Sequence, residues 1–217
     1  MHIFAQFIDI FLHLDVHLSA VIAQYGVWTY LILFVIIFCE TGLVVTPFLP
    51  GDSLLFAAGT FAALGSLDVW MLTALLSAAA ILGNMTNYQI GRIIGPKALS
   101  RENSRIFRKE YLQKTERYFE RYGALTIALS RFAPIVRTFA PFMAGVGRMR
   151  YMKFAAYNFA GGLAWVLAFI FGGYFFGNIP FVRKNFTMVI MVIVLISLMP
   201  TALEVVRHRR EAARQRA

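Results

Sequence analysis

The sequence contains little cysteine and little charge. Cys39 is the only cysteine among 217 residues, which excludes an intramolecular disulfide and a cysteine-based metal site. Charged residues make up 15% of the chain and hydrophobic residues 59%, and the mean hydropathy is +0.65. A soluble domain has about 25% charged residues. The composition therefore excludes an ordinary soluble domain and predicts a chain that lies mainly in lipid.

The N-terminal segment lacks the basic and small residues of a cleavable signal peptide, so we expect it to stay in the mature protein. Phe4, Phe7 and Phe11 share one helical face, whereas polar side chains such as Asp9 lie largely on another. This pattern predicts an amphipathic helix over residues 1–24 that lies in the membrane interface.

Lysine and arginine are absent from the first 91 positions and are concentrated in two later segments. Nine lysines and arginines lie from Arg92 to Arg121, and five arginines follow in residues 207–217. On a soluble surface the net charge of +10 would suggest nucleic-acid binding, but basic residues beside membrane spans mark the cytoplasmic side. We therefore predict that both segments are cytoplasmic and face anionic lipids rather than nucleic acid, and that the N-terminus lies outside.

Three uninterrupted apolar stretches are long enough to cross a bilayer, which takes about 20 helical residues. They cover residues 69–91, 151–177 and 185–206. Residues 97–121 are highly charged with helical periodicity, so we predict a cytoplasmic amphipathic helix there. Residues 207–217 form a basic tail.

Two further apolar regions are interrupted. The interrupting residues are Pro47, Pro50 and Gly51 in region 27–64, and Pro134 and Pro141 in region 123–147. The second region lies between cytoplasmic segments but is too short to cross twice, so we predict a re-entrant hairpin with its break near the prolines. We predict another hairpin, entering from the opposite face, in the first region. The alternative there is one full span plus a loop, which places the N-terminus inside.

A hairpin followed by a span, repeated in opposite orientation, is the inverted-repeat plan of many secondary transporters. The sequence thus predicts an all-α polytopic membrane protein. Its single transport domain covers residues 25–206 and includes an added C-terminal span.

Four charged side chains lie inside the interrupted regions. Glu40 and Asp52 flank the first break, and Arg131 and Arg137 flank Pro134. A charge near the bilayer centre costs roughly 2.5 to 3.5 kcal/mol, so four unpaired charges would cost on the order of 10 kcal/mol. These side chains must therefore be paired, hydrated, or both.

Two interpretations account for these charges. They could form buried salt bridges that hold the hairpins tip to tip, although such pairs contribute little stability. Alternatively, Arg131 and Arg137 bind a phosphate through their planar guanidinium groups, while Glu40 and Asp52 couple transport to protons or cations. The sequence places no cluster of metal ligands beside them, so we expect no metal or cofactor.

Polar and small residues in the spans give weaker signals. Asn84 and Asn87 could hydrogen-bond between helices or line the transport pathway, and the sequence leaves both possibilities open. The glycine pairs at 161–162 and 172–173 predict close packing between helices.

The interrupted regions and the span between them contain four short motifs. They are Phe38-Cys39-Glu40-Thr41-Gly42, Pro47-Phe48-Leu49-Pro50-Gly51-Asp52-Ser53-Leu54, Asn87-Tyr88 with Gly91-Arg92, and Arg131-Phe132-Ala133-Pro134-Ile135-Val136-Arg137-Thr138. Together these motifs resemble the DedA family of bacterial membrane proteins, whose domain is shared with eukaryotic lipid scramblases.

The resemblance implies an inner-membrane protein with two re-entrant hairpins. It also implies a role in recycling undecaprenyl phosphate, the lipid carrier of cell-wall synthesis, and in functions that depend on the proton motive force. The essential carboxylates and arginines of the family correspond to Glu40, Asp52, Arg131 and Arg137. Many relatives have aspartate in place of Asn84, so a third carboxylate is missing here.

These observations together predict a proton-coupled flippase for a polyisoprenyl phosphate. The alternative is an antiporter that exchanges protons for a cation or a drug. A lipid phosphatase agrees less well with the sequence, because the arginines have no histidine or cysteine near them that could act as a nucleophile or base. An assembly scaffold also agrees less well, because it leaves the charges in the membrane unexplained. We therefore expect no enzymatic activity.

Overall fold

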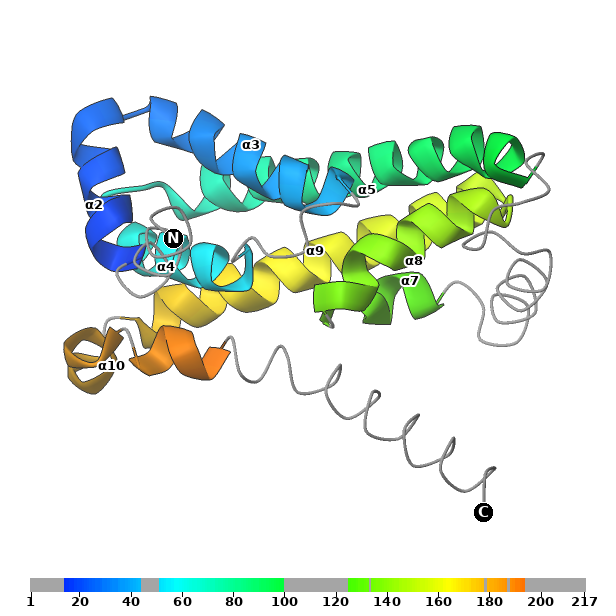
Figure 1. Ribbon diagram of the computed structural model, residues 1–217. Helices are drawn as coiled ribbons and strands as arrows, with labels where there is room; N and C mark the ends of the chain where they lie inside the picture. The colour runs from blue at the N-terminus through cyan, green and yellow to red at the C-terminus, as the bar shows by residue number, and fades with distance from the viewer. Residues whose placement is uncertain are drawn as a thin grey trace, which may run out of the picture.

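A computed structural model of the protein describes residues 14–43, 51–99, 125–132, 134–177, 179–186 and 188–193. These residues form helices and short connections, which confirms the all-α prediction for this part of the chain (Figure 1). Several predicted features lie outside the described residues. They are residues 1–13 of the interfacial helix, Pro47 and Pro50, residues 100–121 of the charged helix, residues 194–206 of the last span, and the tail 207–217.

Two helices are long and apolar enough to cross a membrane. They are α5 (Val69–Leu99) and α9 (Tyr151–Phe176). The two helices contact each other and run in opposite directions (Figure 1). Their positions agree with the predicted spans, although α5 continues about two turns beyond residue 91.

Two pairs of shorter helices occupy the interrupted regions. The first pair is α3 (Trp28–Gly42) and α4 (Gly51–Ala63), and the second is α7 (Leu125–Leu129), continued by η1 (Ser130–Phe132), and α8 (Pro134–Val146). At 1.5 Å per residue, α3 and α4 rise about 20 Å each, less than the roughly 30 Å of a hydrocarbon core. The two pairs approach the middle of α9 from opposite ends of the molecule (Figure 1).

The remaining described helices lie at one end of the molecule (Figure 1). There, α2 (Leu14–Tyr25) covers the second half of the predicted interfacial helix, and α10 (Pro180–Lys184) follows α9. Residues 188–193 of the predicted last span are also helical.

The expectation that Pro141 marks the second break is wrong. The helices of this pair separate just before Pro134, which begins α8, where a missing backbone N–H breaks no helical hydrogen bond. By contrast, α8 continues through Pro141. A proline inside a membrane helix removes one hydrogen bond, and packing against neighbouring helices makes this tolerable.

The contact between α4 and α9 depends on Gly59 and Gly173. Each of these glycines faces the backbone of the opposite helix. A Cβ on Gly59 would strike the carbonyl oxygen of Ile170, and a Cβ on Gly173 would strike that of Phe56. Each carbonyl belongs to the residue three positions before the opposite glycine. The two helix axes can approach this closely only because both positions lack a side chain.

The contact between α5 and α8 has the same construction. A Cβ on Gly145 would strike the carbonyl oxygen of Tyr88, and a Cβ on Gly91 would strike that of Phe142. Here too, each carbonyl lies three positions before the opposite glycine. The second helix of each short pair therefore packs on a long helix through the same reciprocal pattern.

Candidate functional site

The four charged residues selected from the sequence are all buried. Glu40 lies in the last turn of α3, Asp52 in the first turn of α4, Arg131 in η1 and Arg137 in α8. Their exposed fractions are 0%, 7%, 0% and 2%, in that order. The structure brings three of them into direct contact and gives Arg131 different neighbours.

Arg137 connects α8 to both helices of the first short pair. Its Nη1 donates to Oδ1 of Asp52 at 2.8 Å, and its Nη2 donates to Oε1 of Glu40. One guanidinium thus binds two carboxylates that are 85 and 97 residues away in sequence. Because one positive charge faces two carboxylates, this triad is negatively charged when both carboxylates are ionised.

Gly51 completes the surroundings of Glu40. The Gly51 amide donates to Oε1 of Glu40 at 3.2 Å, and a Cβ at position 51 would overlap the carboxylate. Oε2 of Glu40 is buried and has no hydrogen-bond partner among the described residues. Position 51 was predicted as part of a helix break, and the structure adds that it positions a carboxylate.

Trp165 of α9 contacts two members of the triad. Its Nε1 donates to Oδ1 of Asp52 at 2.9 Å, and the Arg137 Cζ lies 4.8 Å from its ring centroid. The side chain is fully buried. Sequence analysis missed this residue because a tryptophan inside an apolar span gives no sign of its partner. Its indole N–H, which needs an acceptor when buried, was the only available signal.

Arg131 is held by amide and carbonyl oxygens instead of carboxylates. Its Nη2 donates to Oδ1 of Asn158 at 2.5 Å and lies 3.4 Å from the backbone oxygens of Ala80 and Asn158. With the Asn84 amide turned so that its oxygen faces Arg131, Nη2 also donates to that oxygen at 3.0 Å. In the described part of the chain, no carboxylate contacts Arg131, and its Nε and Nη1 have no partner.

Asn158 and Asn87 connect helices around this cluster. Besides accepting from Arg131, Asn158 donates through Nδ2 to the Ile81 carbonyl at 3.0 Å. Asn87 donates through Nδ2 to the carbonyls of Thr41 and Thr138, at 3.2 and 2.9 Å, and so joins α5 to α3 and α8. Sequence analysis also missed Asn158, although an asparagine inside the mostly apolar stretch 151–177 was a usable signal.

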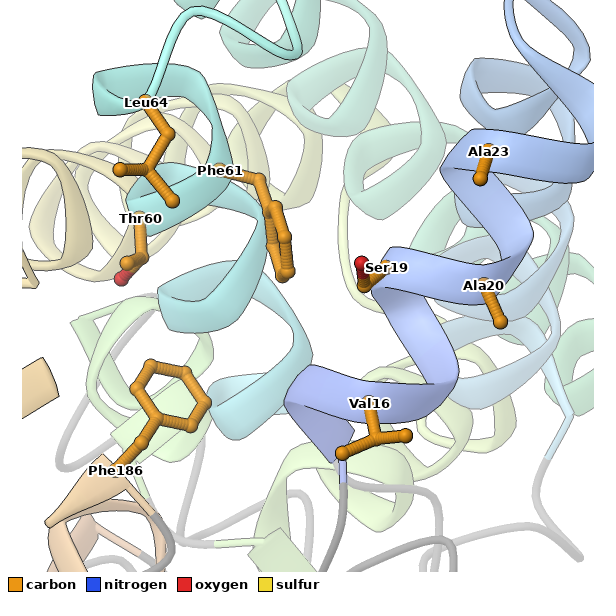
Figure 2. A pocket seen from close by; sticks show the side chains of 8 residues that line it. All are labelled: Val16, Ser19, Ala20, Ala23, Thr60, Phe61, Leu64 and Phe186. Atoms are coloured by element: carbon orange, nitrogen blue, oxygen red, sulfur yellow. The ribbon is translucent and has the colours of Figure 1, made fainter. Parts of the chain in front are cut away.

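A separate hollow of about 520 Å³ lies between α2, α4 and Phe186 (Figure 2). Its lining is mostly apolar and includes Val16, Ala20, Phe61 and Leu64. None of the four charged residues lines it. Such a lining suits hydrocarbon rather than a charged group.

The VTT domain matches residues 49–175, a segment that contains Asp52, Arg131 and Arg137. Over 209 residues, 95% of each chain, the sequence is 56% identical to protein DedA of Escherichia coli strain K12. This chain belongs to the DedA family. The resemblance seen in the sequence motifs is thereby confirmed.

Other DedA relatives are named as membrane proteins. An uncharacterized membrane protein of Mycobacterium tuberculosis strain H37Rv is 44% identical over 183 residues, 82% of this chain and 80% of that protein. The inner membrane protein YghB of Escherichia coli strain K12 is 36% identical over 156 residues, 72% of this chain and 71% of that protein. No solved structure matches this chain. The DedA relatives and the two long apolar helices together identify a membrane protein.

Proposed function

We propose that this DedA-family protein is a proton-coupled transporter that flips a polyisoprenyl phosphate, undecaprenyl phosphate, across the bacterial inner membrane for cell-envelope synthesis. The observation that carries the proposal is that Arg131 is buried without a counter-charge among the described residues. This guanidinium is fully buried, contacts no carboxylate among the described residues and has two nitrogens without partners. An uncompensated buried cation is costly, and a phosphate would supply both the missing charge and the missing acceptors.

Arg137 supplies the coupling to protons. Its two terminal nitrogens bind Glu40 and Asp52, which compete with any phosphate for the same guanidinium. A proton taken up by one carboxylate removes a charge that holds Arg137, so the freed donor can turn to a phosphate held by Arg131. Proton binding and phosphate binding therefore favour each other, and loss of the proton favours release. The substrate undergoes no chemical change.

The repeated helix contacts support an inverted repeat. The reciprocal glycine pattern joins α4 to α9 and α8 to α5, so α4 corresponds to α8 and α5 to α9. In this arrangement α3 corresponds to α7, and regions 27–64 and 123–147 are the two re-entrant hairpins. Transporters built this way move one repeat against the other around a central site, which here is the charged cluster.

The distribution of charged residues at the ends of α5 and α9 supports a cytoplasmic position for one end of the molecule. Basic residues at the end of α5 and the start of α9, which lie together in Figure 1, are Arg92, Arg148, Arg150 and Lys153. The opposite end has Asp68 before α5, and Arg183 and Lys184 in α10. The basic excess therefore favours a cytoplasmic position for the first end and an outside position for residues 64–68.

One observation favours the antiporter as a second candidate. The triad has one guanidinium for two carboxylates, and the buried Oε2 of Glu40 is an unused acceptor that could bind a cation. In that mechanism the arginines gate Glu40 and Asp52. It leaves the unpaired charge of Arg131 unexplained, which is why we place the phosphate carrier first.

Reconstitution into liposomes tests the proposed function. Polyisoprenyl phosphate is placed in one leaflet, a pH gradient is imposed, and arrival of the phosphate in the other leaflet is followed with a membrane-impermeant reagent. We expect gradient-stimulated movement of the phosphate lipid, with the exposed-site variant Arg150→Lys behaving as wild type. Gradient-driven cation or drug movement without lipid movement would contradict the proposal and support the antiporter.

A further inference from the structure

Glu40 and Asp52 bind the same guanidinium but occupy opposite ends of helix dipoles. Asp52 lies in the first turn of α4, where unpaired N–H groups favour a negative charge. Glu40 lies in the last turn of α3, where unpaired carbonyls disfavour one. The helix termini therefore favour an ionised Asp52 and a neutral Glu40.

The deeper burial of Glu40 acts in the same direction. Each carboxylate accepts two hydrogen bonds on one oxygen: Oδ1 of Asp52 accepts from Arg137 Nη1 and Trp165 Nε1, and Oε1 of Glu40 accepts from Arg137 Nη2 and the Gly51 amide. Glu40 is fully buried, and its Oε2 has no partner among the described residues, so a proton there would displace no existing hydrogen bond. Asp52 remains 7% exposed. Of the two carboxylates, Glu40 has the surroundings that tolerate charge less well.

Trp165 creates much of this difference. Its indole N–H can only donate, so it stabilises an acceptor such as ionised Asp52. Its ring lies beside the Arg137 guanidinium, an arrangement that favours a cation at this position. One rigid side chain thus contacts both members of the Asp52–Arg137 ion pair, and its single N–H donor is used by Asp52 and not by Glu40.

We infer that Trp165 is a positioning residue that keeps Asp52 ionised against Arg137, so that Glu40 alone carries the coupling proton. This inference rests on the proposed proton-coupled function. It goes further by assigning different roles to two carboxylates that the sequence treats as equivalent.

Other groups around the cluster do not compete for this proton. The described side chains that hydrogen-bond to the triad or to Arg131 include Asn84 of α5 and Asn158 and Trp165 of α9. Asparagine and tryptophan do not titrate, and arginine stays protonated under ordinary conditions. None of these neighbouring groups therefore supplies the coupling proton.

The emission of Trp165 reports which carboxylate titrates. The chain has three tryptophans, and Trp28 and Trp70 are each 69% exposed, outside the cluster. Full-length protein carrying Trp28→Phe and Trp70→Phe is purified into nanodiscs, and the emission of the remaining Trp165 is followed as a function of pH. Neither a lipid substrate nor transport is needed, so the result is independent of the proposed function.

We expect the Trp165 emission to show one pH-dependent transition, which disappears in Glu40→Gln and remains in Asp52→Asn. Loss of the transition in Asp52→Asn with retention in Glu40→Gln would overturn the inference, as would the absence of any transition. If the transition follows Glu40 but liposomes show no movement of phosphate lipid, the inference stands for the proton site and only the proposed function fails.

The role of Trp165 is tested with Trp165→Phe, which keeps an aromatic ring beside Arg137 but removes the N–H donor. The protonated carboxyl bands of this variant are measured by infrared spectroscopy at a series of pH values. We expect a second carboxyl band that disappears when Asp52→Asn is added, because Asp52 can then take up a proton. An infrared titration identical to wild type would show that Trp165 positions nothing, whatever its effect on stability.

Discussion

The amide nitrogen of Gly51 donates to Oε1 of Glu40 at 3.2 Å, across the meeting point of α3 and α4. A Cβ at position 51 would overlap that carboxylate. The two helices can therefore meet here only because residue 51 has no side chain. The contact fixes Glu40 at the place where Arg137 reaches it.

Replacing this glycine should disturb both stability and transport. Gly51→Ala forces the Glu40 carboxylate away from Arg137. We expect the free energy of unfolding to fall by roughly 1 to 3 kcal/mol and gradient-driven flux to be lost. Thermal unfolding in detergent and liposome flux measure the two effects. Gly172→Ala is the control, because its Cβ would meet only the Phe56 ring at 3.8 Å. A Gly51→Ala protein with wild-type stability and flux would contradict this arrangement.

Removing Arg137 should leave two buried carboxylates uncompensated. We expect Arg137→Gln to lower stability by roughly 3 to 5 kcal/mol, the cost of breaking a buried ion pair from one side. Adding Glu40→Gln and Asp52→Asn removes the stranded charges and should restore most of that loss. Thermal unfolding of the single and triple variants measures this. A triple variant that is no more stable than Arg137→Gln would argue against the triad.

The reciprocal glycine contacts predict equivalent behaviour in the two halves. Gly173→Ala and Gly91→Ala should each lower stability by roughly 1 to 3 kcal/mol, because each new Cβ would strike a backbone carbonyl of the packed helix. Gly172→Ala, next to Gly173 in sequence, is the matched control and should remain near wild type. Full tolerance of either Gly173→Ala or Gly91→Ala would count against equivalent contacts.

Membrane orientation can be tested with single cysteines in a Cys39→Ser background. We expect a membrane-impermeant thiol reagent to label Ser66→Cys from outside, and to label Ser104→Cys and Ala217→Cys only after the cytoplasmic side is opened. Labelling at position 66 only from the cytoplasmic side would contradict the inverted repeat and favour a full span in region 27–64.

The cost of buried charge allowed sequence analysis to find the main cluster. Any carboxylate or guanidinium at membrane depth needs compensation, whichever helices surround it, so Glu40 and Arg137 could be identified without a fold. The bounds of α9 were predictable for a similar reason, because bilayer thickness sets the length of an apolar span.

The pairing within the cluster could not be predicted. Arg131 and Arg137 lie six residues apart on either side of Pro134 and look equivalent in sequence. Only the packing of α8 on α5 and beside α3 decides which guanidinium meets the carboxylates. The positions of Asn158 and Trp165 depend on the same packing. Pro141 was misassigned because tertiary contacts allow a helix to continue through proline.

Arg131 provides the most direct test of phosphate binding. Because Arg131 contacts no carboxylate among the described residues, Arg131→Gln leaves no buried carboxylate without its counter-charge and should be at least as stable as wild type. Binding of polyisoprenyl phosphate to the purified proteins is measured by titration calorimetry, with uncharged polyisoprenol as the control ligand. We predict about 10- to 100-fold weaker phosphate-lipid binding by Arg131→Gln, with polyisoprenol binding unchanged. A folded Arg131→Gln protein that binds the phosphate lipid as tightly as wild type would contradict the account.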